Sequence, residues 1–494
     1  MYNIDVYNTH IEISPYKIGD IPKLEKMCAV YIKAEYRYEP LGFYYDESSE
    51  ILYIPRGISI PWLETNLNSK CKIHYEYDKF KKISHIELTG LPRDDIQKNA
   101  IDFLTTDGKF KINGENSQLI LNLDTGDGKT FCAIAAICKM RKKALIITHT
   151  DTIRNQWIKS FLNHTDITKE QMMVIEGTSA IDNIISGKSE SADIYFISHA
   201  TISFCANRRG WEYVKFLFEK LYIGIKIYDE AHLCFKNVIR TDMFSNTYLT
   251  IYLTATLGRS DESENRLYKK CFNNAFKFGV NSIDYNAHNK HIIYVPMLYE
   301  SDMSEYDKCK TNTAYGFSFN RYLSLMMSNN SNRLKNMICY VLDIAMRING
   351  RILITTSIVE SIEWIYSFLK AILYDKDKVI GTYHSKNRVE DNLYTKENAD
   401  IIISTIKGNG TGSDIRDLRC IINIESFSSP IIAKQLAGRL RPYEDGRECY
   451  IFDIIDTSLQ STLHQYKCRL KQMQIKCKDI RMMKVIVPYN PFIS

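Results

Sequence analysis

The fold of this chain is decided by the stretch Leu119-Ile120-Leu121-Asn122-Leu123-Asp124-Thr125-Gly126-Asp127-Gly128-Lys129-Thr130. Its first five residues form an apolar run of strand length, and residues 131–136 continue as an apolar helical stretch. Gly126 and Gly128 let the backbone between strand and helix curl, so that successive N–H groups converge on one point. A helix that begins at such a turn directs its partial positive charge at the same point. The stretch therefore predicts a parallel α/β domain with a phosphate-binding loop.

Short apolar runs alternate with amphipathic helical stretches on both sides of this loop. The first set of runs is 119–123, 144–147, 194–197, 225–228 and 249–253, and the second set is 351–354, 378–380, 401–403, 420–424 and 449–452. Alternation of this kind is typical of parallel sheets. The N-terminal part shows short alternating runs instead, with strands expected at 27–32 and 51–54. We therefore expect an α/β chain of two tandem parallel-sheet domains, 86–280 and 281–494, preceded by a small mixed or β-rich domain, 1–85.

The composition of the chain excludes several classes of protein. It has 494 residues, 45% hydrophobic and 25% charged, which fits two to four globular domains. Its 22 glycines and 11 prolines are too few for a collagen-like or linker-dominated chain. No window approaches the ~18 apolar residues of a membrane span, and the first residues lack the pattern of a signal peptide. The 13 cysteines form no CxxC pair. We therefore expect a cytoplasmic protein, in the host cytoplasm if the source is a virus or phage, that does not bind membranes.

The loop supplies the candidate nucleotide-binding residues, which are Asp124, Thr125, Gly126, Asp127, Gly128, Lys129 and Thr130. Lys129 is expected to reach the β- and γ-phosphates of ATP, and the Thr130 hydroxyl to bind Mg²⁺. Leu123 stands where the strict pattern has glycine, so an ordinary glycine turn is the alternative. Asp127 places an acid in the loop, and its carboxylate is expected to point outward, because a carboxylate facing ATP would weaken binding.

A pair of carboxylates follows another apolar run. Asp229 and Glu230 come directly after residues 225–228, about a hundred residues beyond the phosphate loop. A buried strand that delivers two adjacent carboxylates at its carboxyl end is what Mg²⁺-assisted hydrolysis requires. Asp229 is expected to hold the metal, and Glu230 to orient and deprotonate the attacking water. The alternative, an acidic pair at a helix N-cap, is disfavoured by the distance from the phosphate loop.

The sequence resembles the superfamily 2 helicases and translocases. The resemblance rests on the phosphate loop, Asp229-Glu230-Ala231-His232 and Leu253-Thr254-Ala255-Thr256, and it covers residues 90–455. The other family motifs follow in order: Gln97, Thr148 with Gln156-Trp157, Ser198-His199, Thr355-Thr356, Thr405 with Gly412 and Asp414, and Gln435 with Arg439 and Arg441. The Gln-Trp element and the form of the loop most resemble the UvsW, RecG and XPB type of DNA helicase and related phage and viral helicases.

The resemblance implies two RecA-like domains that hydrolyse ATP, with Mg²⁺, in the cleft between them. Gln97 would then read the adenine, and Gly412 and Asp414 would join the nucleotide site. Arg439 would act as the arginine finger. Arg441 would be the second arginine, although the family places it three residues after the first, where this chain has Pro442. The residues implied to couple hydrolysis to nucleic acid are His232, Thr254, Thr256 and Gln435.

Contacts with the nucleic-acid backbone are implied for Thr148, Gln156, Trp157, Ser198, His199, Thr355, Thr356 and Thr405. For the small hydroxyl residues the alternative is a role in strand-end capping or turn formation. The C-terminal stretch 464–484 is strongly basic and forms either a nucleic-acid-contacting helix or a solvated helix face. Trp62 could stack on bases, but core packing is the favoured interpretation.

The leading hypothesis is an ATP-dependent DNA helicase or translocase that remodels duplex or branched DNA in recombination, repair or replication. We expect a monomer that binds duplex, forked, branched or single-stranded DNA through its phosphates, without sequence preference. The net charge of +6 is compatible with this partner but does not argue for it. An RNA helicase or transcript-release ATPase is the alternative, because RNA helicases share the Asp-Glu-Ala-His string. A restriction-type translocase subunit is less favoured, because the sequence shows no nuclease carboxylate cluster. A non-catalytic nucleic-acid-binding scaffold is the alternative of another class, favoured only by Asp127 and the displaced Arg441.

Overall fold

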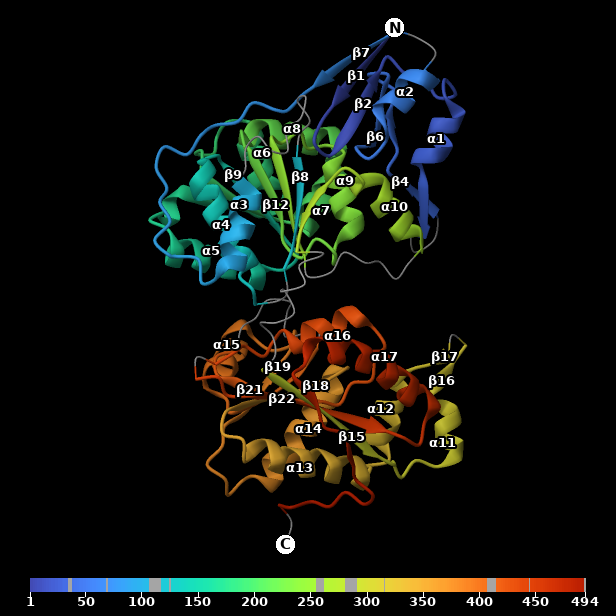
Figure 1. The fold of residues 1–494 in the computed structure, drawn as a ribbon, viewed down its shortest axis with the longest axis vertical. Helices are drawn as coiled ribbons and strands as arrows, with labels where there is room; N and C mark the ends of the chain where they lie inside the picture. The colour runs from blue at the N-terminus through green and yellow to red at the C-terminus, as the bar shows by residue number, and fades with distance from the viewer. Residues whose placement is uncertain are drawn as a thin grey trace. The chain divides into compact units, whose positions relative to one another are not determined.

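In a computed structural model of this chain, the described residues are 1–33, 38–67, 70–105, 117–123, 126–254, 262–279, 291–314, 316–406, 415–443 and 445–492. The predicted site residues Asp124, Thr125, Thr256, Gly412 and Asp414 lie outside these ranges. The chain divides into two compact units, Met1–Asn281 and Ser282–Ser494, and each is described by itself (Figure 1). Within the described ranges, no helix has the length and apolar character needed to cross a membrane.

The first unit opens with a five-stranded sheet of order β5-β6-β2-β1-β7, which is mixed because β1 pairs antiparallel with β2 and parallel with β7. Its strands are β1 (Tyr2–Val6), β2 (His10–Ser14), β5 (Tyr44–Asp46), β6 (Ile51–Pro55) and β7 (Cys71–Tyr75), while β3 (Val30–Lys33) and β4 (Tyr38–Leu41) pair separately. Two helices, α1 (Pro22–Cys28) and α2 (Ile60–Asn66), complete this part. The strand expected at 27–32 is wrong in its first half, because α1 starts at a proline and buries Leu24 and Cys28 at helical spacing.

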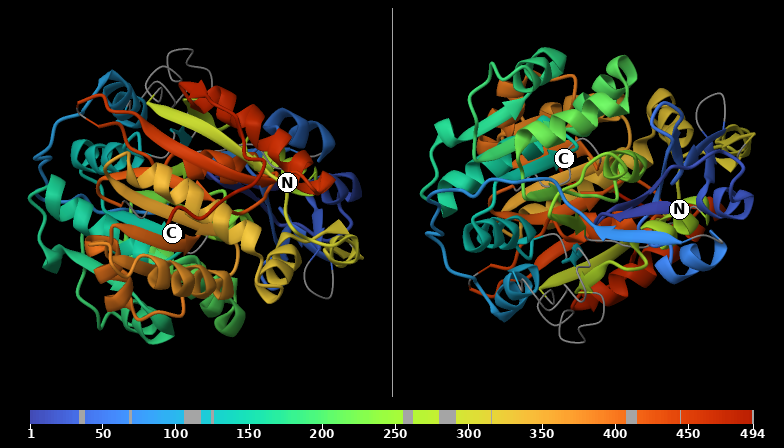
Figure 2. Two further views of the ribbon diagram at one scale, coloured as in Figure 1. Left: turned by 90° about the horizontal axis from the view of Figure 1, so that it is seen from below. Right: turned by 90° about the horizontal axis from the view of Figure 1, so that it is seen from above.

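The rest of the first unit surrounds a seven-stranded sheet of order β10-β11-β9-β12-β13-β8-β14, in which all neighbours are parallel. The strands are β8 (Ser117–Asn122), β9 (Ala144–Thr148), β10 (Met172–Ile175), β11 (Ile194–Ser198), β12 (Ile225–Tyr228), β13 (Leu249–Thr254) and β14 (Phe276–Phe278). The helices are α3 (Asp95–Thr105), α4 (Lys129–Met140), α5 (Asp151–His164), η1 (Lys169–Gln171), α6 (Gly177–Ile185), α7 (His199–Arg209), α8 (Trp211–Leu221), α9 (Phe235–Asp242) and α10 (Glu262–Phe272). Helices cover both faces of this sheet (Figure 1, Figure 2), so its strands are continuous apolar runs.

The second unit contains another parallel sheet, of order β19-β20-β18-β21-β22-β15-β23, with β24 also paired to β15. Its strands are β15 (Ile292–Tyr299), β18 (Arg351–Thr356), β19 (Ile380–Tyr383), β20 (Ile401–Thr405), β21 (Leu418–Asn423), β22 (Cys449–Asp456), β23 (Asp479–Ile480) and β24 (Met483–Lys484), with β16 (Asn312–Thr313) and β17 (Gly316–Phe317) paired apart. The helices are α11 (Glu305–Lys310), α12 (Phe319–Ser328), α13 (Asn332–Met346), α14 (Val359–Ile372), α15 (Val389–Asn398), α16 (Pro430–Ala437) and α17 (Gln460–Lys476). The predicted fold class is confirmed: two parallel α/β sheets and a mixed N-terminal sheet.

The basic C-terminal stretch is only partly solvent-facing. It forms α17, whose Arg469 is buried and pairs with Asp453 through two contacts, Nε–Oδ2 at 3.0 Å and Nη2–Oδ1 at 3.3 Å. A bidentate pair of this kind fixes the planar guanidinium. Arg469 therefore ties α17 to β22 inside the second unit and is not available to a nucleic acid.

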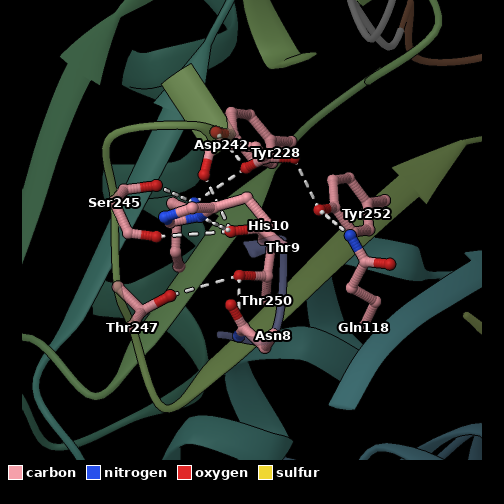
Figure 3. A network of polar contacts seen from close by, with 11 residues as sticks. Asn8, Thr9, His10, Gln118, Tyr228, Asp242, Ser245, Thr247, Thr250 and Tyr252 are labelled. Atoms are coloured by element: carbon pink, nitrogen blue, oxygen red, sulfur yellow. Dashed lines mark hydrogen bonds and ion pairs between the residues drawn. The ribbon is translucent and has the colours of Figure 1, made fainter. Parts of the chain in front are cut away.

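A buried polar network joins the N-terminal sheet to the parallel sheet of the same unit (Figure 3). Asn8 Nδ2, in the turn between β1 and β2, donates to Thr250 Oγ1 on β13 at 3.2 Å. Thr9 Oγ1 donates to the main-chain oxygen of Asp242, at the end of α9, at 2.8 Å. All four residues are buried. The β1–β2 turn is therefore anchored between strands and helices that lead to the candidate site.

Candidate functional site

The phosphate loop is shaped by two glycines ahead of α4. Gly126 has φ +102° and Gly128, the N-cap of α4, has φ +83°, both in the left-handed region that favours glycine. A Cβ on Gly128 would also lie 2.3 Å from Gln97 Nε2. Both backbone conformation and packing therefore require glycine at this position.

Gln97 lies on α3 and is buried against this loop. Its Oε1 accepts the N–H of Arg93 at 2.8 Å, and its Nε2 donates to the main-chain oxygen of Asp127 at 3.1 Å. The side chain thus holds the loop backbone directly. The structure brings Gln97 to the loop, while its role in reading adenine stays a prediction.

Two carboxylates lie beside the loop at the carboxyl end of β12. Glu230 Oε1 is 3.9 Å from Lys129 Nζ, which also donates to the main-chain oxygen of Leu123 at 3.1 Å. Asp229 Oδ1 accepts the N–H of Glu230 at 2.9 Å. Glu230 has φ +46°, a strained backbone conformation that costs about 1–3 kcal/mol and is found mainly at functional sites. We call Lys129, Thr130, Asp229 and Glu230 the phosphate-loop site.

Trp157 lies on α5 and is buried, with 1% of its surface exposed. Its indole Nε1 donates to Asp229 Oδ2 at 2.8 Å. Burial and the neighbouring Glu230 carboxylate raise the pKa of Asp229 to about 6, and the Trp157 hydrogen bond acts in the opposite direction. The expected contact of Trp157 with nucleic acid does not fit this position, because the ring faces the carboxylate and not solvent. Gln156, the preceding residue, is half-buried.

His232 and Thr254 meet next to these carboxylates. His232 Nδ1 lies 3.1 Å from Thr254 Oγ1 and 3.3 Å from Glu230 Oε2. Thr254 is the last residue of β13, the strand beside β12. The structure therefore brings together two of the four predicted coupling residues, and it does so at the phosphate-loop site.

Several known proteins are similar to this chain. Residues 81–259 match the family described as "Type III restriction enzyme, res subunit". Over 442 residues the chain is 26% identical to "Putative helicase 161L" of Invertebrate iridescent virus 6, covering 86% of this chain and 88% of that protein. It is 23% identical over 355 residues to transcript termination protein A18 of Yaba monkey tumor virus, covering 70% and 69%. A match of 26% over 150 residues to DNA 3'-5' helicase XPB of Kineococcus radiotolerans covers 30% and 25%.

These matches support a protein of the superfamily 2 helicase type. The family match spans Lys129, Asp229 and Glu230, so the matched sequence and the phosphate-loop site coincide. The fold is similar to that of Dbp5 from S. cerevisiae bound to RNA and ADP BeF3, with a TM-score of 0.51 over 79% of this chain and 89% of that one. Sequence identity there is 16%, so this likeness concerns the fold alone.

The remaining nucleic-acid candidates on the first unit lie at the carboxyl ends of β9 and β11. Ser198 Oγ accepts the N–H of Thr201 at 3.0 Å and thereby caps α7, which is the structural alternative considered for such residues. Thr148 is buried at the end of β9. The buried His199 ring stacks on Tyr228 at 5.7 Å, and burial lowers its pKa to about 4. His199 therefore packs the core as a neutral ring and does not face a nucleic acid.

One contact that the sequence did not predict joins this region to the phosphate-loop site. His149 Nδ1, directly after β9, lies 3.1 Å from Cys234 Sγ, two residues beyond the Asp-Glu-Ala-His string. The following helix α5 carries Trp157, which reaches Asp229. The β9–α5 segment therefore contacts the acidic segment at two points. The members of these two pairs are 85 and 72 positions apart in the sequence, so no local sequence pattern could have predicted either contact.

On the second unit, the hydroxyl candidates lie at the carboxyl ends of β18 and β20 and are buried. Thr355 Oγ1 donates to Asn423 Oδ1 at 3.0 Å, and Thr356 Oγ1 lies 2.7 Å from Ser361 Oγ. Thr405 is the last residue of β20. These hydroxyls stabilise strand ends in this structure, and their contact with nucleic acid stays a prediction.

The arginine candidates follow α16 in the second unit. Arg439 Nη2 donates to the main-chain oxygen of Ile406 at 3.0 Å. Burial lowers the pKa of Arg439 to about 10, with nearby Arg441 acting in the same direction, so the guanidinium stays charged at neutral pH. Gln435 and Arg441 are half-buried, on and just after the same helix.

Proposed function

We propose that this chain is an ATP-dependent DNA helicase or translocase that remodels duplex or branched DNA. The observation that carries the proposal is the convergence of Lys129 and Glu230, with Asp229 fixed by Trp157, at the carboxyl end of a parallel sheet. In this proposal residues 86–280 and 281–494 are the two motor domains. Residues 1–85 are an accessory domain.

The residues of the phosphate-loop site fit ATP and Mg²⁺. Mg²⁺ is commonly held by one or two protein oxygens together with nucleotide phosphates and water, where it neutralises developing charge. Asp229 and Thr130 supply such oxygens. Each Asp229 oxygen accepts one hydrogen bond and keeps a lone pair for a further partner.

In this proposal each side chain at the nucleotide has a separate role in hydrolysis. Lys129 and the first N–H groups of α4 bind phosphate oxygens. Glu230 orients the attacking water and accepts its proton, and it is held in place by its contact with His232. His232 contacts both Glu230 and Thr254, so a shift of the Glu230 side chain is transmitted to the end of β13. Arg439 of the second motor domain supplies positive charge to the transferring phosphate.

DNA is the proposed partner, bound through phosphates and without sequence preference. One relative is named as a DNA helicase, and the form of the phosphate loop and the Gln-Trp element resemble the DNA-helicase type. A transcript-release ATPase is the second candidate, because a transcript termination protein is similar over 70% of this chain. The two candidates differ in the nucleic acid that stimulates hydrolysis.

The test is a comparison of ATPase rates without nucleic acid and with single-stranded, duplex, forked and four-way DNA and with RNA. We expect DNA to stimulate hydrolysis about 5–150-fold, the usual range of coupling between two sites, with branched DNA the strongest. Lys129→Ala serves as the inactive control. No stimulation by any DNA would overturn the proposal. Stimulation by RNA alone would favour the second candidate.

Trp157→Phe tests the positioning of Asp229. This change removes the indole donor and keeps an aromatic ring in the core. Groups that orient a metal-binding carboxylate typically contribute 10–100-fold to metal affinity or activity, so we expect the Mg²⁺ concentration for half-maximal ATPase to rise about tenfold. Trp364→Phe, on α14 of the second unit, is the matched control. An unchanged Mg²⁺ titration in Trp157→Phe would assign the indole a packing role only.

A further inference from the structure

In the first unit, the segment between β7 and α3 runs past the residues that end α4 and α8 (Figure 1). The N–H of Lys81 donates to the main-chain oxygen of Tyr222 at 2.9 Å, and the N–H of Ile83 donates to that of Arg141 at 2.9 Å. The N–H of Lys143 donates to the main-chain oxygen of Lys81 at 3.1 Å. These bonds bring two distant basic segments together. We define the basic surface as the exposed residues Lys79, Lys81, Lys82 and Arg141, with Lys142 buried directly beneath it.

Aromatic rings are interleaved with these cations. Lys81 Nζ lies 4.8 Å from the ring centroid of Tyr222, and beneath the surface the buried Lys142 places its Nζ 4.8 Å from that of Tyr248. Tyr77 packs edge-on against Tyr248 at 5.1 Å. Tyr77 is 46% exposed and Tyr222 is 37% exposed, so both rings present surface to solvent. The surface therefore offers planar rings as well as positive charge.

A glycine permits this arrangement. A Cβ on Gly224 would lie 3.0 Å from Lys142 Cβ and 3.1 Å from Phe80 Cδ2. Glycine therefore lets Lys142 and Phe80 lie flat on the start of β12. This packing holds Lys142 between Phe80 and Tyr248, 5.6 Å from the first ring centroid.

The acidic groups nearby do not neutralise the surface. The backbone of Asp78 is fixed to Asn246 by an N–H···O bond of 2.7 Å, and burial together with Glu219 raises the pKa of its carboxyl to about 7. Asp193 lies 3.7 Å from Lys143, which is buried and outside the defined surface. Glu76 is exposed at the start of the segment. Four exposed cations thus lie near few ionised carboxylates.

The basic surface lies at the opposite edge of the sheet from the phosphate-loop site. Lys143 directly precedes β9, and Gly224 directly precedes β12, so the surface adjoins the amino ends of both strands. Thr148 and Asp229 lie at the carboxyl ends of the same two strands. Each strand has four or five residues and rises about 3.3 Å per residue, so its two ends are more than about 10 Å apart. The basic surface and the phosphate-loop site are therefore distinct sites.

We propose that this basic surface binds a second segment of single-stranded nucleic acid. Lysines and arginine pair with phosphates, and exposed tyrosine rings stack on unpaired bases, which is how sequence-independent single-strand sites are built. A duplex would use the cations but leave the rings without partners. An acidic peptide would do the same. The inference rests on the proposed action on nucleic acid, and it adds a binding site away from the one coupled to hydrolysis.

The test measures binding of fluorescein-labelled oligothymidine of 10 and 40 nucleotides, without ATP, over a series of KCl concentrations. For the full-length K79Q/K81Q/K82Q variant we expect about tenfold weaker binding of the long strand. The slope of log affinity against log salt should fall by about 2, because each lost phosphate contact on a single strand contributes about 0.7. Tyr77→Leu should weaken long-strand binding without changing the slope. Stimulation of ATPase by a saturating long strand should persist in both variants.

The matched control is K370Q/K376Q/K378Q, which removes three exposed lysines from the second unit. Strands carrying 4-thiothymidine should crosslink to peptides containing Tyr77 or Tyr222. Equal affinities and slopes in both lysine variants, or the absence of these crosslinks, would overturn the second site. Equal weakening of duplex and single-strand binding would also overturn the assignment to single strands. Because binding is measured without ATP, failure of this site is distinguishable from a lack of DNA-stimulated hydrolysis.

Discussion

Replacing Glu230 with glutamine is expected to lower kcat for ATP hydrolysis about 10²–10⁴-fold, the usual contribution of a general base. The amide has nearly the same shape as the carboxylate but accepts no proton from water. Glu230 Oε1 lies 3.9 Å from Lys129 Nζ and Oε2 lies 3.3 Å from His232 Nδ1, so both oxygens are held in the site. ATP binding should survive, because phosphate contacts are assigned to Lys129 and the loop backbone. Single-turnover hydrolysis and binding of a fluorescent ATP analogue measure the two effects separately.

The control for this change is Glu170→Gln, which makes the same substitution on the exposed helix η1. It should leave both measurements unchanged. Near-normal hydrolysis in Glu230→Gln would mean that another group takes the proton. It would remove Glu230 from the mechanism, even if Lys129 proved essential.

Much of the site could be predicted because parallel sheets place the carboxyl ends of their strands at one edge. The apolar runs before Asp229 and Thr254 identified two neighbouring strands, and the glycine loop identified a third. Because neighbouring parallel strands end at the same edge of the sheet, the residues at their carboxyl ends lie close together. The contact of His232 with Thr254 follows from this rule.

The rest depends on pairs that no local pattern reveals. The indole of Trp157 meets Asp229 across 72 positions, and this pairing changes Trp157 from a nucleic-acid candidate into a support for a carboxylate. In the sequence, Arg469 cannot be told apart from the exposed lysines and arginines around it. In the structure it is buried because it pairs with Asp453. At the chain start, residues 27 and 28 fit a strand by composition, but helical burial of Cys28 with Leu24 prevails.

Replacing Asp242 with asparagine is expected to lower the free energy of unfolding of the first unit by about 3–5 kcal/mol, the usual cost of breaking a buried ion pair. Lys226 is fully buried in the middle of β12, and its Nζ lies 2.8 Å from Asp242 Oδ1. Burial lowers the pKa of Lys226, and Asp242 is the charge that opposes this shift. Without it, the ammonium must either stay buried without its counter-charge or lose its proton. Urea unfolding followed by circular dichroism measures the change.

The same carboxylate supports two strands of the site. The hydroxyls of Tyr228 and Tyr252 donate to Asp242 at 2.8 and 2.7 Å, from β12 and β13 (Figure 3). Tyr228 directly precedes Asp229, and Tyr252 stands two residues before Thr254. Loss of the pair should therefore loosen the strand ends that carry the phosphate-loop site. Hydrogen exchange of β12 and β13 amides should quicken more than that of β18 in the second unit.

A double substitution separates loss of the pair from loss of one charge. In K226M/D242N both charges are gone, and the new amide still offers an acceptor to Tyr228, so at least half of the lost stability should return. Asp102→Asn is the control, because the Lys139–Asp102 pair is 3.2 Å long but largely exposed and should contribute less than about 1 kcal/mol. If the losses from K226M and D242N simply add in the double variant, the two charges do not stabilise each other. The anchoring of β12 would then rest on the tyrosine hydroxyls and apolar packing.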